Sequence, residues 1–385
     1  MSVDLGFIEK CEPWRLESRF FPSKVGGKPA WLDLRNIPRE NDVSCEYCCE
    51  PCIFLCQIYA PHEDVEAAFH RTIYVFICKK AECCRPNENG NLKVFRSQLP
   101  RVNDFYPSEP PVEEVDWRTD ISANKWVKTC SVCGISAPNH CSKCKAVNYC
   151  SRAHQIYDWK NGHKESCGST KQSCTKLLFP EYEIDVEAEE NSNGDETDEN
   201  NSDEEEKELE KYRKMTDTGK AGTFQDADVH NELMNMATSK EDETFAQFRT
   251  QIDKYPEQVL RYNKGGEPLY ISSENKVDKI PKCAECNEER RFEFQIMPQL
   301  LNFLELGNAL NSIDWGILAI FTCAKSCVPK NKYCVEYVWK QDIVEDKPST
   351  DSAFVDLSKT FPFYFVSHKW ANNVSLRLNR ICRRF

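Results

Sequence analysis

Cysteine and histidine side chains dominate the chemistry that this sequence could perform. Between residues 130 and 167 they form Cys-x2-Cys, Cys-x2-Cys, Cys-x3-His and His-x3-Cys pairs. A Cys-x2-Cys turn presents two thiolates to one metal ion, and zinc takes four nitrogen or sulfur ligands in a tetrahedron. Eight such ligands predict two zinc ions in one finger. The expected sites are interleaved, with Cys130, Cys133, Cys150 and His154 in one and Cys141, Cys144, His163 and Cys167 in the other.

Neither set leaves an open coordination position, so we expect structural rather than catalytic zinc. A segment of about 40 residues buries too little apolar surface to fold alone. A structural zinc ion contributes about 10–16 kcal/mol to folding, which would supply the missing stability.

Two further Cys-x2-Cys pairs lie on either side of the finger, and each is followed by a pair with a spacing of three or four residues. They predict one more zinc site in each half of the chain. Cys49-x2-Cys52 is a rival pair in the first half, and Cys84 is an alternative to Cys83. The predicted sets are Cys45, Cys48, Cys78 and Cys83 in the first half, and Cys283, Cys286, Cys323 and Cys327 in the second.

An internal repeat aligns these two sets. Gly26-Gly27-x-Pro29-x-Trp31 in the first half corresponds to Gly265-Gly266-x-Pro268-x-Tyr270 in the second. Gln57 follows Cys48 by nine positions, and Gln295 follows Cys286 by nine positions. This common offset favours Cys45 and Cys48 over the rival pair. The repeat predicts two related β-rich modules that form one body, with the finger as an insertion.

The fold class predicted for the chain is mostly β (α+β). Short aromatic and β-branched runs at 52–60 and 71–78 indicate strands. Phe245, Phe248 and Ile252 recur at helical spacing before Pro256, which indicates a helix from about 241. The expected divisions are a β-rich zinc module (1–110), the finger (126–168), an acidic disordered linker (181–240), a second β-rich zinc module (241–342) and a tail of undetermined role (343–385).

Charge is concentrated in one place. Of the net charge of −12, residues 183–210 contribute fifteen acids and one Lys, so the rest of the chain is nearly neutral. The first residues, MSVDLGFIEKCEPW, lack the basic start and apolar core of a secretory signal, and no apolar run approaches the roughly 18 residues of a membrane span. We therefore expect a cytoplasmic and nuclear protein without membrane contact. Of its 22 cysteines, the fourteen in the four sets are expected to bind metal rather than form disulfides, and most of the other eight to be packing or surface thiols.

Several stretches resemble the programmed cell death protein 2 family. DLGFIE, KVGGKPAWLDL and VFRSQLPRVNDFY resemble its N-terminal half. The stretch CSVCGISAPNHCSKCKAVNYCSRAHQIYDWKNGHKESC resembles its MYND-type zinc finger. FEFQIMPQLLNFL, SIDWGILAIFTCAKSC and YVWKQD resemble its C-terminal domain. The resemblance runs from Leu5 to Asp342 apart from the acidic stretch, whereas the family normally ends near VWKQD and this chain continues for some 43 residues.

This resemblance implies a non-enzymatic zinc protein of cytoplasm and nucleus. It implies a dedicated chaperone that captures one newly made, basic small-subunit ribosomal protein and supports assembly of the 40S subunit. Links to stem-cell maintenance, proliferation and cell death would follow from ribosome supply. The sequence also lacks a G-x-x-x-x-G-K-[ST] or G-x-G-x-x-G phosphate loop, which favours a role without catalysis.

An alternative is a transcriptional or signalling adaptor that recruits Pro-rich partners through the finger. Tyr157 and Trp159 would form an aromatic surface of the kind that binds such peptides, unless Trp159 covers the zinc core. The acidic linker would either screen a basic client or serve only as a soluble tether. Nucleic-acid binding is not expected, because residues 126–168 carry six Lys or Arg and two acids, and ligating thiolates cancel much of that excess.

Overall fold

The computed structural model describes residues 3–169, 177–189, 243–306, 312–328, 330 and 332–343. Ten strands form one closed barrel in the order β1-β8-β2-β3-β4-β5-β12-β11-β10-β9. Their bounds are β1 (Asp4–Glu9), β2 (Lys24–Val25), β3 (Ile53–Tyr59), β4 (His70–Ile77), β5 (Leu92–Leu99), β8 (Tyr182–Ala188), β9 (Leu260–Tyr262), β10 (Arg290–Ile296), β11 (Ile317–Cys323) and β12 (Tyr333–Gln341).

The helical elements are short and lie around the barrel. Those with α or π geometry are α1 (Arg152–Asp158), η7 (Trp159–His163), α2 (Lys164–Ser166) and α5 (Glu243–Lys254). The 3-10 turns are η1 (Pro13–Leu16), η2 (Ser18–Phe20), η3 (Glu40–Val43), η4 (Glu66–Ala68), η5 (Ala81–Cys83), η6 (Ala123–Lys125) and η8 (Pro298–Phe303). A two-stranded ribbon in the finger pairs β6 (Asn139–His140) with β7 (Asn148–Tyr149). Among the described residues, no helix has the length and apolarity needed to cross a membrane.

The prediction of a mostly β chain is confirmed, since ten strands of the described part close into one barrel. The expected strands appear as β3 and β4, and the helix expected from about 241 appears as α5, which buries Phe248 and Ile252. Both halves contribute to the same sheet, because β5 of the first half pairs with β12 of the second.

The acidic linker requires a correction at its start. Residues 181–240 were expected to be disordered, but β8 occupies Tyr182–Ala188 and pairs with both β1 and β2. Tyr182, Ile184 and Val186 alternate with acids. Ile184 is buried in the barrel, whereas Asp185 and Glu187 are exposed. The acid content concealed this period-two pattern. The remainder of the linker and the tail, apart from Ile343, lie outside the described residues.

The two halves share local geometry at corresponding positions. A bulge in β3 lies between Phe54 and Cys56, and a bulge in β10 lies between Phe292 and Phe294. The Gln57 side chain accepts a hydrogen bond from the backbone N–H of Ala30 at 2.9 Å. In the second half, the Gln295 side chain accepts one from the N–H of Leu269 at 2.6 Å. Gln57 and Gln295 thus fasten corresponding loops to corresponding strands.

Apolar side chains from strands on all sides of the barrel meet in one buried cluster, so they fill its interior. The cluster includes Ile73 and Val75 of β4, Phe294 of β10, Leu318 of β11 and Val338 of β12. The width of a barrel grows with its number of strands, and a small barrel is narrow enough for side chains to fill its interior.

Buried ion pairs cross between the two halves. Arg71 of β4 donates to Glu293 of β10 with a 2.7 Å contact between Nη2 and Oε2, and both side chains are fully buried. Thr322 and Tyr262 also donate to the Glu293 carboxylate. Burial raises the pKa of Glu293, but the Arg71 charge and its hydrogen bonds outweigh burial and lower the pKa to about 2. The carboxylate is therefore held ionised inside the barrel.

A second pair repeats this arrangement near the C-terminal cysteines. Arg96 Nε of β5 lies 2.7 Å from Glu336 Oε1 of β12, and Arg290 Nε lies 2.8 Å from Glu336 Oε2. Arg96 Nη1 also donates to the backbone oxygen of Cys327 at 3.0 Å. This network links the first half of the barrel to the second-half cysteine set.

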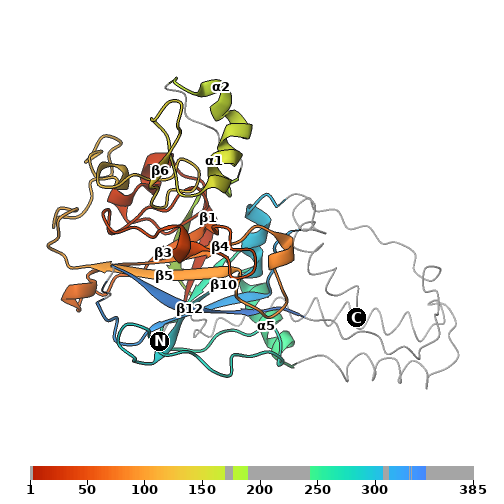
Figure 1. Cartoon of the computed structure of the whole chain (residues 1–385). Helices are drawn as coiled ribbons and strands as arrows, with labels where there is room; N and C mark the ends of the chain where they lie inside the picture. The colour runs from red at the N-terminus through yellow and green to blue at the C-terminus, as the bar shows by residue number, and fades with distance from the viewer. Residues whose placement is uncertain are drawn as a thin grey trace, which may run out of the picture.

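The finger stands on the outer face of the first half, on the opposite side of the barrel from α5 (Figure 1). Trp31 donates its indole N–H to the backbone oxygen of Gly134 at 2.9 Å, and Ser136 donates its N–H to the oxygen of Pro38 at 3.0 Å. Gly134 has φ of +79°, and a Cβ there would lie 3.1 Å from the Cβ of Lys28. Glycine thus suits both the backbone angle and the close approach.

Replacing Arg71 with Met should destabilise the protein by about 3–5 kcal/mol, because Glu293 would become a buried charge without its partner. Urea unfolding followed by tryptophan fluorescence measures the change. The double change Arg71→Met and Glu293→Leu should recover much of it. Lys80→Met is the control, since its pair with Glu50 is exposed. Equal losses for Arg71→Met and Lys80→Met would contradict the importance of the buried pair.

Acid should weaken this pair in a defined range. The folded pKa of Glu293 is about 2, below the value of about 4.3 for an unfolded chain. Its stabilising contribution is therefore complete above about pH 4.3 and is lost as the pH falls towards 2. The stability difference between the wild type and the Arg71→Met, Glu293→Leu double variant should shift in favour of the variant over this range. An unchanged difference from pH 6 to pH 2.5, measured by urea unfolding, would count against the assignment.

Candidate metal centres

Each of the four Cys-x2-Cys turns has the same backbone shape. The residue after the second cysteine has a left-handed φ, and its N–H donates to the carbonyl oxygen of the first cysteine. This turn directs both thiols to the same side. The four donor–acceptor pairs are Cys49–Cys45 (2.9 Å), Gly134–Cys130 (2.9 Å), Lys145–Cys141 (2.9 Å) and Asn287–Cys283 (2.8 Å). The φ values are 59° at Cys49, 79° at Gly134, 55° at Lys145 and 59° at Asn287.

The structure brings all sixteen predicted ligands together in the four expected quartets. Within each quartet the candidate ligand atoms all lie within 4.8 Å of one another. The quartets are Cys45, Cys48, Cys78 and Cys83; Cys130, Cys133, Cys150 and His154; Cys141, Cys144, His163 and Cys167; and Cys283, Cys286, Cys323 and Cys327.

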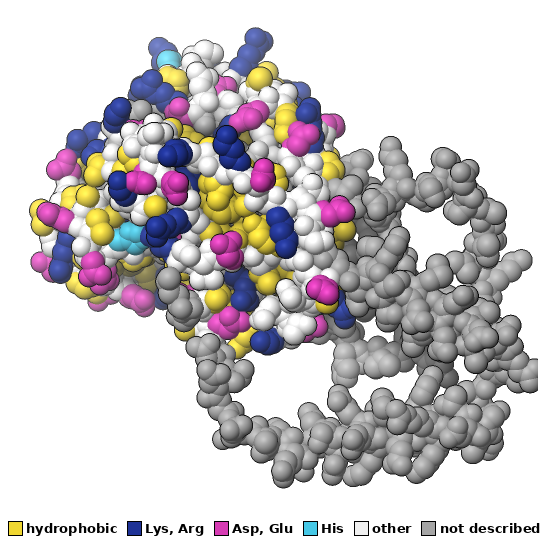
Figure 2. Space-filling view, turned by 90° about the horizontal axis from the view of Figure 1, so that it is seen from below, with side chains coloured by type: hydrophobic (Ala, Val, Ile, Leu, Met, Phe, Trp, Pro, Cys, Tyr) yellow, Lys and Arg dark blue, Asp and Glu magenta, His cyan; other side chains and the backbone are white. Residues whose placement is uncertain are grey.

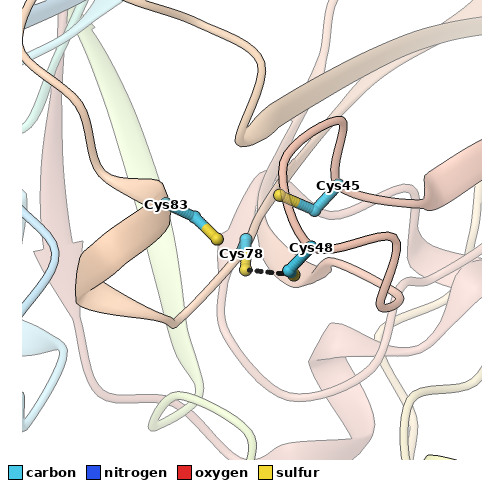
Figure 3. A group of neighbouring side chains, drawn as sticks. All are labelled: Cys45, Cys48, Cys78 and Cys83. Carbon is cyan, nitrogen blue, oxygen red and sulfur yellow. Dashed lines mark hydrogen bonds between the residues drawn. The ribbon is translucent and has the colours of Figure 1, made fainter.

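In the first quartet, three separate segments meet (Figure 3). Cys45 and Cys48 come from the turn before β3, Cys78 directly follows β4, and Cys83 ends η5. The sulfurs of Cys48 and Cys78 are 3.7 Å apart. Cys45, Cys78 and Cys83 are buried, and Cys48 is partly exposed. The site therefore fixes the turn before β3 against the end of β4.

The C-terminal quartet has the same arrangement on the second half. Cys283 and Cys286 precede β10, Cys323 ends β11, and Cys327 lies four residues further on. The Sγ atoms of Cys283 and Cys327 are 3.7 Å apart, and those of Cys286 and Cys323 are 3.6 Å apart. Cys286 is exposed, so this quartet is more accessible to solvent than the first.

The first finger quartet is completely buried. The sulfurs of Cys133 and Cys150 are 3.6 Å apart, and Cys150 lies 3.2 Å from Nδ1 of His154. Ser151 caps α1 by accepting the backbone N–H of His154 at 3.1 Å. This cap starts the helix just after Cys150, so that His154 in the first helical turn lies beside the Cys150 thiol.

The second finger quartet is built from a distorted helical turn. Gly162, with φ of 144°, interrupts the helical backbone inside η7 and is followed by His163. Nε2 of His163 lies 3.6 Å from the sulfur of Cys144, and the sulfurs of Cys141 and Cys167 are 4.0 Å apart. The Trp159 ring packs edge-on against His163 at 5.9 Å between centroids. Trp159 thus packs on a predicted zinc ligand, in line with the packing alternative.

Local backbone groups prepare some of these thiols for ionisation. Burial raises the pKa of Cys283, but N–H groups of Cys286 and Glu285 outweigh it, and the pKa falls to about 7. Burial likewise raises the pKa of Cys144, whereas the N–H of Ala146 and other donors lower it to about 6. Zinc binds thiolates, so these turns favour the ligating form near neutral pH.

The four donor sets fit zinc. A Zn–S bond of about 2.3 Å in a tetrahedron places two sulfurs about 3.8 Å apart. The sulfur–sulfur contacts quoted above run from 3.6 to 4.0 Å. Four soft or borderline ligands converge in each quartet, as in closed structural sites. Each set could therefore hold an ion as a staple between segments that are distant in sequence.

The remaining cysteines of the described residues occupy other positions. Cys49 is exposed and occupies the left-handed position of its turn, while Cys52 is buried with its sulfur 3.6 Å from the oxygen of Asn91. Cys84 contacts the backbone of Asp314 instead of a quartet. Cys334 is buried beside the C-terminal quartet. The expected pairing of Cys45 with Cys48 and the choice of Cys83 thus agree with the geometry.

Of the histidines outside the finger that the structure describes, neither His62 nor His70 belongs to a quartet, although His62 contacts the Ser326 hydroxyl between Cys323 and Cys327 at 3.2 Å. His70 stacks on Phe21 at 4.4 Å between ring centroids and contacts the Tyr59 hydroxyl at 3.0 Å, so it is a packing residue. Sequence reasoning missed the Arg96 and Glu336 network behind Cys327. Single charged residues in strands carry no spacing pattern, so the sequence offered no signal for it.

The fold and the site define the class: a closed β-barrel protein with candidate zinc quartets and an added MYND-type zinc finger. Three family models match: the N-terminal domain of programmed cell death protein 2 at residues 2–113, the MYND finger at 130–167 and the C-terminal domain of programmed cell death protein 2 at 242–342. The chain belongs to the programmed cell death protein 2 family.

Relatives support this membership over most of the chain. Programmed cell death protein 2 of Bos taurus is 43% identical over 354 residues, which is 89% of this chain and 97% of the relative. Programmed cell death protein 2-like of Homo sapiens is 28% identical over 323 residues, 80% of this chain and 86% of the relative. A probable 20S rRNA accumulation protein 4 of Schizosaccharomyces pombe is 32% identical over 114 residues, 25% of this chain and 28% of the relative. No solved structure matches.

Adjacent cysteines provide a sharp test of the turn geometry. Cys48→Ser should lower the zinc content by about one ion per chain, because Cys48 points into the first quartet. Cys49→Ser should leave it unchanged, because Cys49 only supplies the left-handed position. Metal analysis of the purified full-length variants by mass spectrometry measures both. Zinc loss in Cys49→Ser, with zinc retained in Cys48→Ser, would reverse the ligand assignment.

Proposed function

We propose that this chain is a non-enzymatic, zinc-stabilised chaperone for a basic small-subunit ribosomal protein in cytoplasm and nucleus. The observation that carries the proposal is membership of this family together with the Schizosaccharomyces pombe relative, whose name refers to 20S rRNA accumulation. Links to cell proliferation, stem-cell maintenance and cell death would be indirect results of ribosome supply.

Four zinc ions belong to this proposal, one in each quartet. All four sets offer four protein ligands and no open position, which suits stapling rather than hydrolysis. The matching bulges, glutamine hydrogen bonds and cysteine turns support an internal duplication, in which residues 26–83 and 265–327 are two copies of one module.

Charge supports a basic client. Strand β8 exposes Asp185 and Glu187, and it leads into the acid-rich sequence that continues to Glu210. A free ribosomal protein carries many uncompensated positive charges, and a nearby acidic chain raises its local concentration and screens its repulsion. The electrostatic part of binding should therefore weaken as salt is added.

The adaptor alternative depends on the finger surface. Ile156 is 43% exposed, and Tyr157 and Trp159 are partly exposed on the same helical stretch. One side of the finger is already used internally, since Gly134 and Ser136 contact the first half of the barrel. The body, rather than the finger, then offers the larger surface for a client.

Identifying the proteins that co-purify with the tagged full-length chain distinguishes the chaperone from the adaptor. We expect one dominant small-subunit ribosomal protein, retained when Tyr157 is changed to Ala and lost when Cys283 and Cys286 are both changed to Ser. The first change alters the finger surface without removing a ligand, while the second removes half of the C-terminal quartet. Quantitative mass spectrometry of the co-purified proteins gives the readout. Pro-rich regulators lost with Tyr157→Ala, with no ribosomal protein, would establish the adaptor instead.

A further inference from the structure

The four quartets differ in how far solvent reaches their ligands. All sixteen ligands lie in the described part of the chain, and Cys286 alone among them is exposed. The first finger quartet is buried throughout, while the other two quartets have one or two ligands of intermediate exposure. A small solute can therefore reach a ligand sulfur of the C-terminal quartet without any opening of the fold.

The turn that carries Cys286 is less covered than its counterpart in the first half. Glu285 stands just before Cys286, whereas the repeat places Tyr47 before Cys48. Tyr47 and Cys48 pack against the buried cluster of the first half, and the guanidinium of Arg85 lies 4.0 Å from the ring centroid of Tyr47. The second-half turn has a carboxylate in place of this ring, and its Cys286 is open to water.

Surface charge does not restrict the access of a neutral solute to this half. The second half lies in the lower part of the molecule in Figure 1, and Figure 2, which views this side, shows Lys and Arg side chains interspersed with Asp and Glu over the described residues. Hydrogen peroxide is small and uncharged, so the exposure of a thiolate decides where it reacts.

A second sulfur lies next to that of Cys286. The Sγ atoms of Cys286 and Cys323 are 3.6 Å apart, and Cys323 is fully buried. A disulfide bond is about 2.05 Å long, so the two sulfurs need to approach by about 1.5 Å once no ion holds them apart. Cys286 is therefore the sulfur that meets an oxidant, and Cys323 is the sulfur that can close a disulfide with it.

Zinc-bound cysteines are thiolates, which is the form that peroxides oxidise. We propose that Cys286 is a modification site for hydroperoxides, whose oxidation closes a disulfide with Cys323 and releases the ion of the C-terminal quartet. The inference rests on the zinc ion that the proposed function assigns to this quartet, and it does not depend on the client.

The oxidation takes place in two steps. The Cys286 thiolate attacks one oxygen of hydrogen peroxide, so that the O–O bond breaks, a sulfenic acid forms and hydroxide leaves. The Cys323 thiolate then attacks the Cys286 sulfur, so that the S–O bond breaks, the S–S bond forms and a second hydroxide leaves. Two protons from solvent convert both hydroxides to water. The two thiolates together lose two electrons, one peroxide molecule gains them, and the quartet loses two of its four ligands.

Loss of the ion frees the turn before β10 from the end of β11. The N–H of Ala324 donates to the backbone oxygen of Glu289 at 3.0 Å, so backbone hydrogen bonds still join the two segments. The effect should therefore be local, in residues 281–289 and 323–328, and the finger should keep both of its ions.

The purified full-length zinc protein is treated with hydrogen peroxide, and released zinc is followed with a coloured chelator. We expect about one ion per chain to be released before the others, together with a disulfide between Cys286 and Cys323. Mass spectrometry of alkylated peptides identifies the disulfide, and hydrogen exchange should rise in 281–289 and 323–328. First oxidation in another quartet, or release of zinc while Cys286 is still a free thiol, would overturn the proposal.

A matched pair of variants separates the ligand from the exposed thiol. Cys286→His keeps four ligands, with an imidazole nitrogen in place of the exposed sulfur, so it should retain zinc and release it at least about tenfold more slowly in peroxide. Cys49→Ser is the control, because Cys49 is exposed but belongs to no quartet, and its release rate should match the wild type. Equal release rates in zinc-loaded Cys286→His and the wild type would overturn the proposal. If Cys286→His holds no zinc, the peptide mapping of the wild-type protein decides.

The zinc content of the double variant Cys283→Ser, Cys286→Ser distinguishes failure of this inference from failure of the proposed function. One ion fewer per chain than in the wild type supports zinc in this quartet, and the peroxide experiment then judges the inference alone. Equal zinc content in the variant and the wild type overturns the C-terminal zinc assignment and the inference with it.

Discussion

Closure of the barrel by two half-chains is the constraint on which the rest of the structure depends. Arg71 and Arg96 belong to the first half, and their buried partners Glu293 and Glu336 belong to the second. A half that folded alone would bury a charge without its partner, at a cost of several kcal/mol. The main effect of these ion pairs is therefore to make the folding of each half depend on the other, rather than to add net stability. The β5–β12 pairing supplies the backbone side of the same requirement.

The cysteine quartets connect segments at the ends of strands that are not joined by the hydrogen bonds of the sheet. In both halves a quartet joins the turn before one strand to the end of the next, at Cys78 after β4 and at Cys323 in β11. Arg96 connects the two kinds of constraint, because it pairs with Glu336 and donates to the oxygen of Cys327. Metal binding in the second half and ion pairing between the halves should therefore be energetically coupled, as neighbours in one network usually are.

The metal-ligand quartets could be predicted from the sequence more completely than the strands and contacts of the barrel. Cysteine spacing identifies quartets because each Cys-x2-Cys turn is a local unit with its own backbone geometry, and Cys49 shows how that geometry resolves an ambiguous doublet. Strand β8 was missed because its acids conceal the alternation of Tyr182, Ile184 and Val186. The ion pairs between the halves were missed for another reason. Arg71 and Glu293 are 222 residues apart, and no local sequence pattern predicts a contact between residues so distant in the chain.

The finger explains why two related halves need not have the same role. It follows β5 in the chain and packs on the first half, where Trp31, Leu32 and Leu34 are buried while Lys28, Arg35 and Asn36 of the same loop stay exposed. In the second half, Gln295 makes the hydrogen bond that corresponds to that of Gln57. There Leu269 and Tyr270 are partly buried and pack against the cluster that contains Phe248 and Ile252 of α5. The corresponding loops are therefore covered by different elements, the finger in the first half and α5 in the second. The finger thus has a structural part in the first half, because Gly134 accepts a hydrogen bond from Trp31 and Ser136 donates one to Pro38.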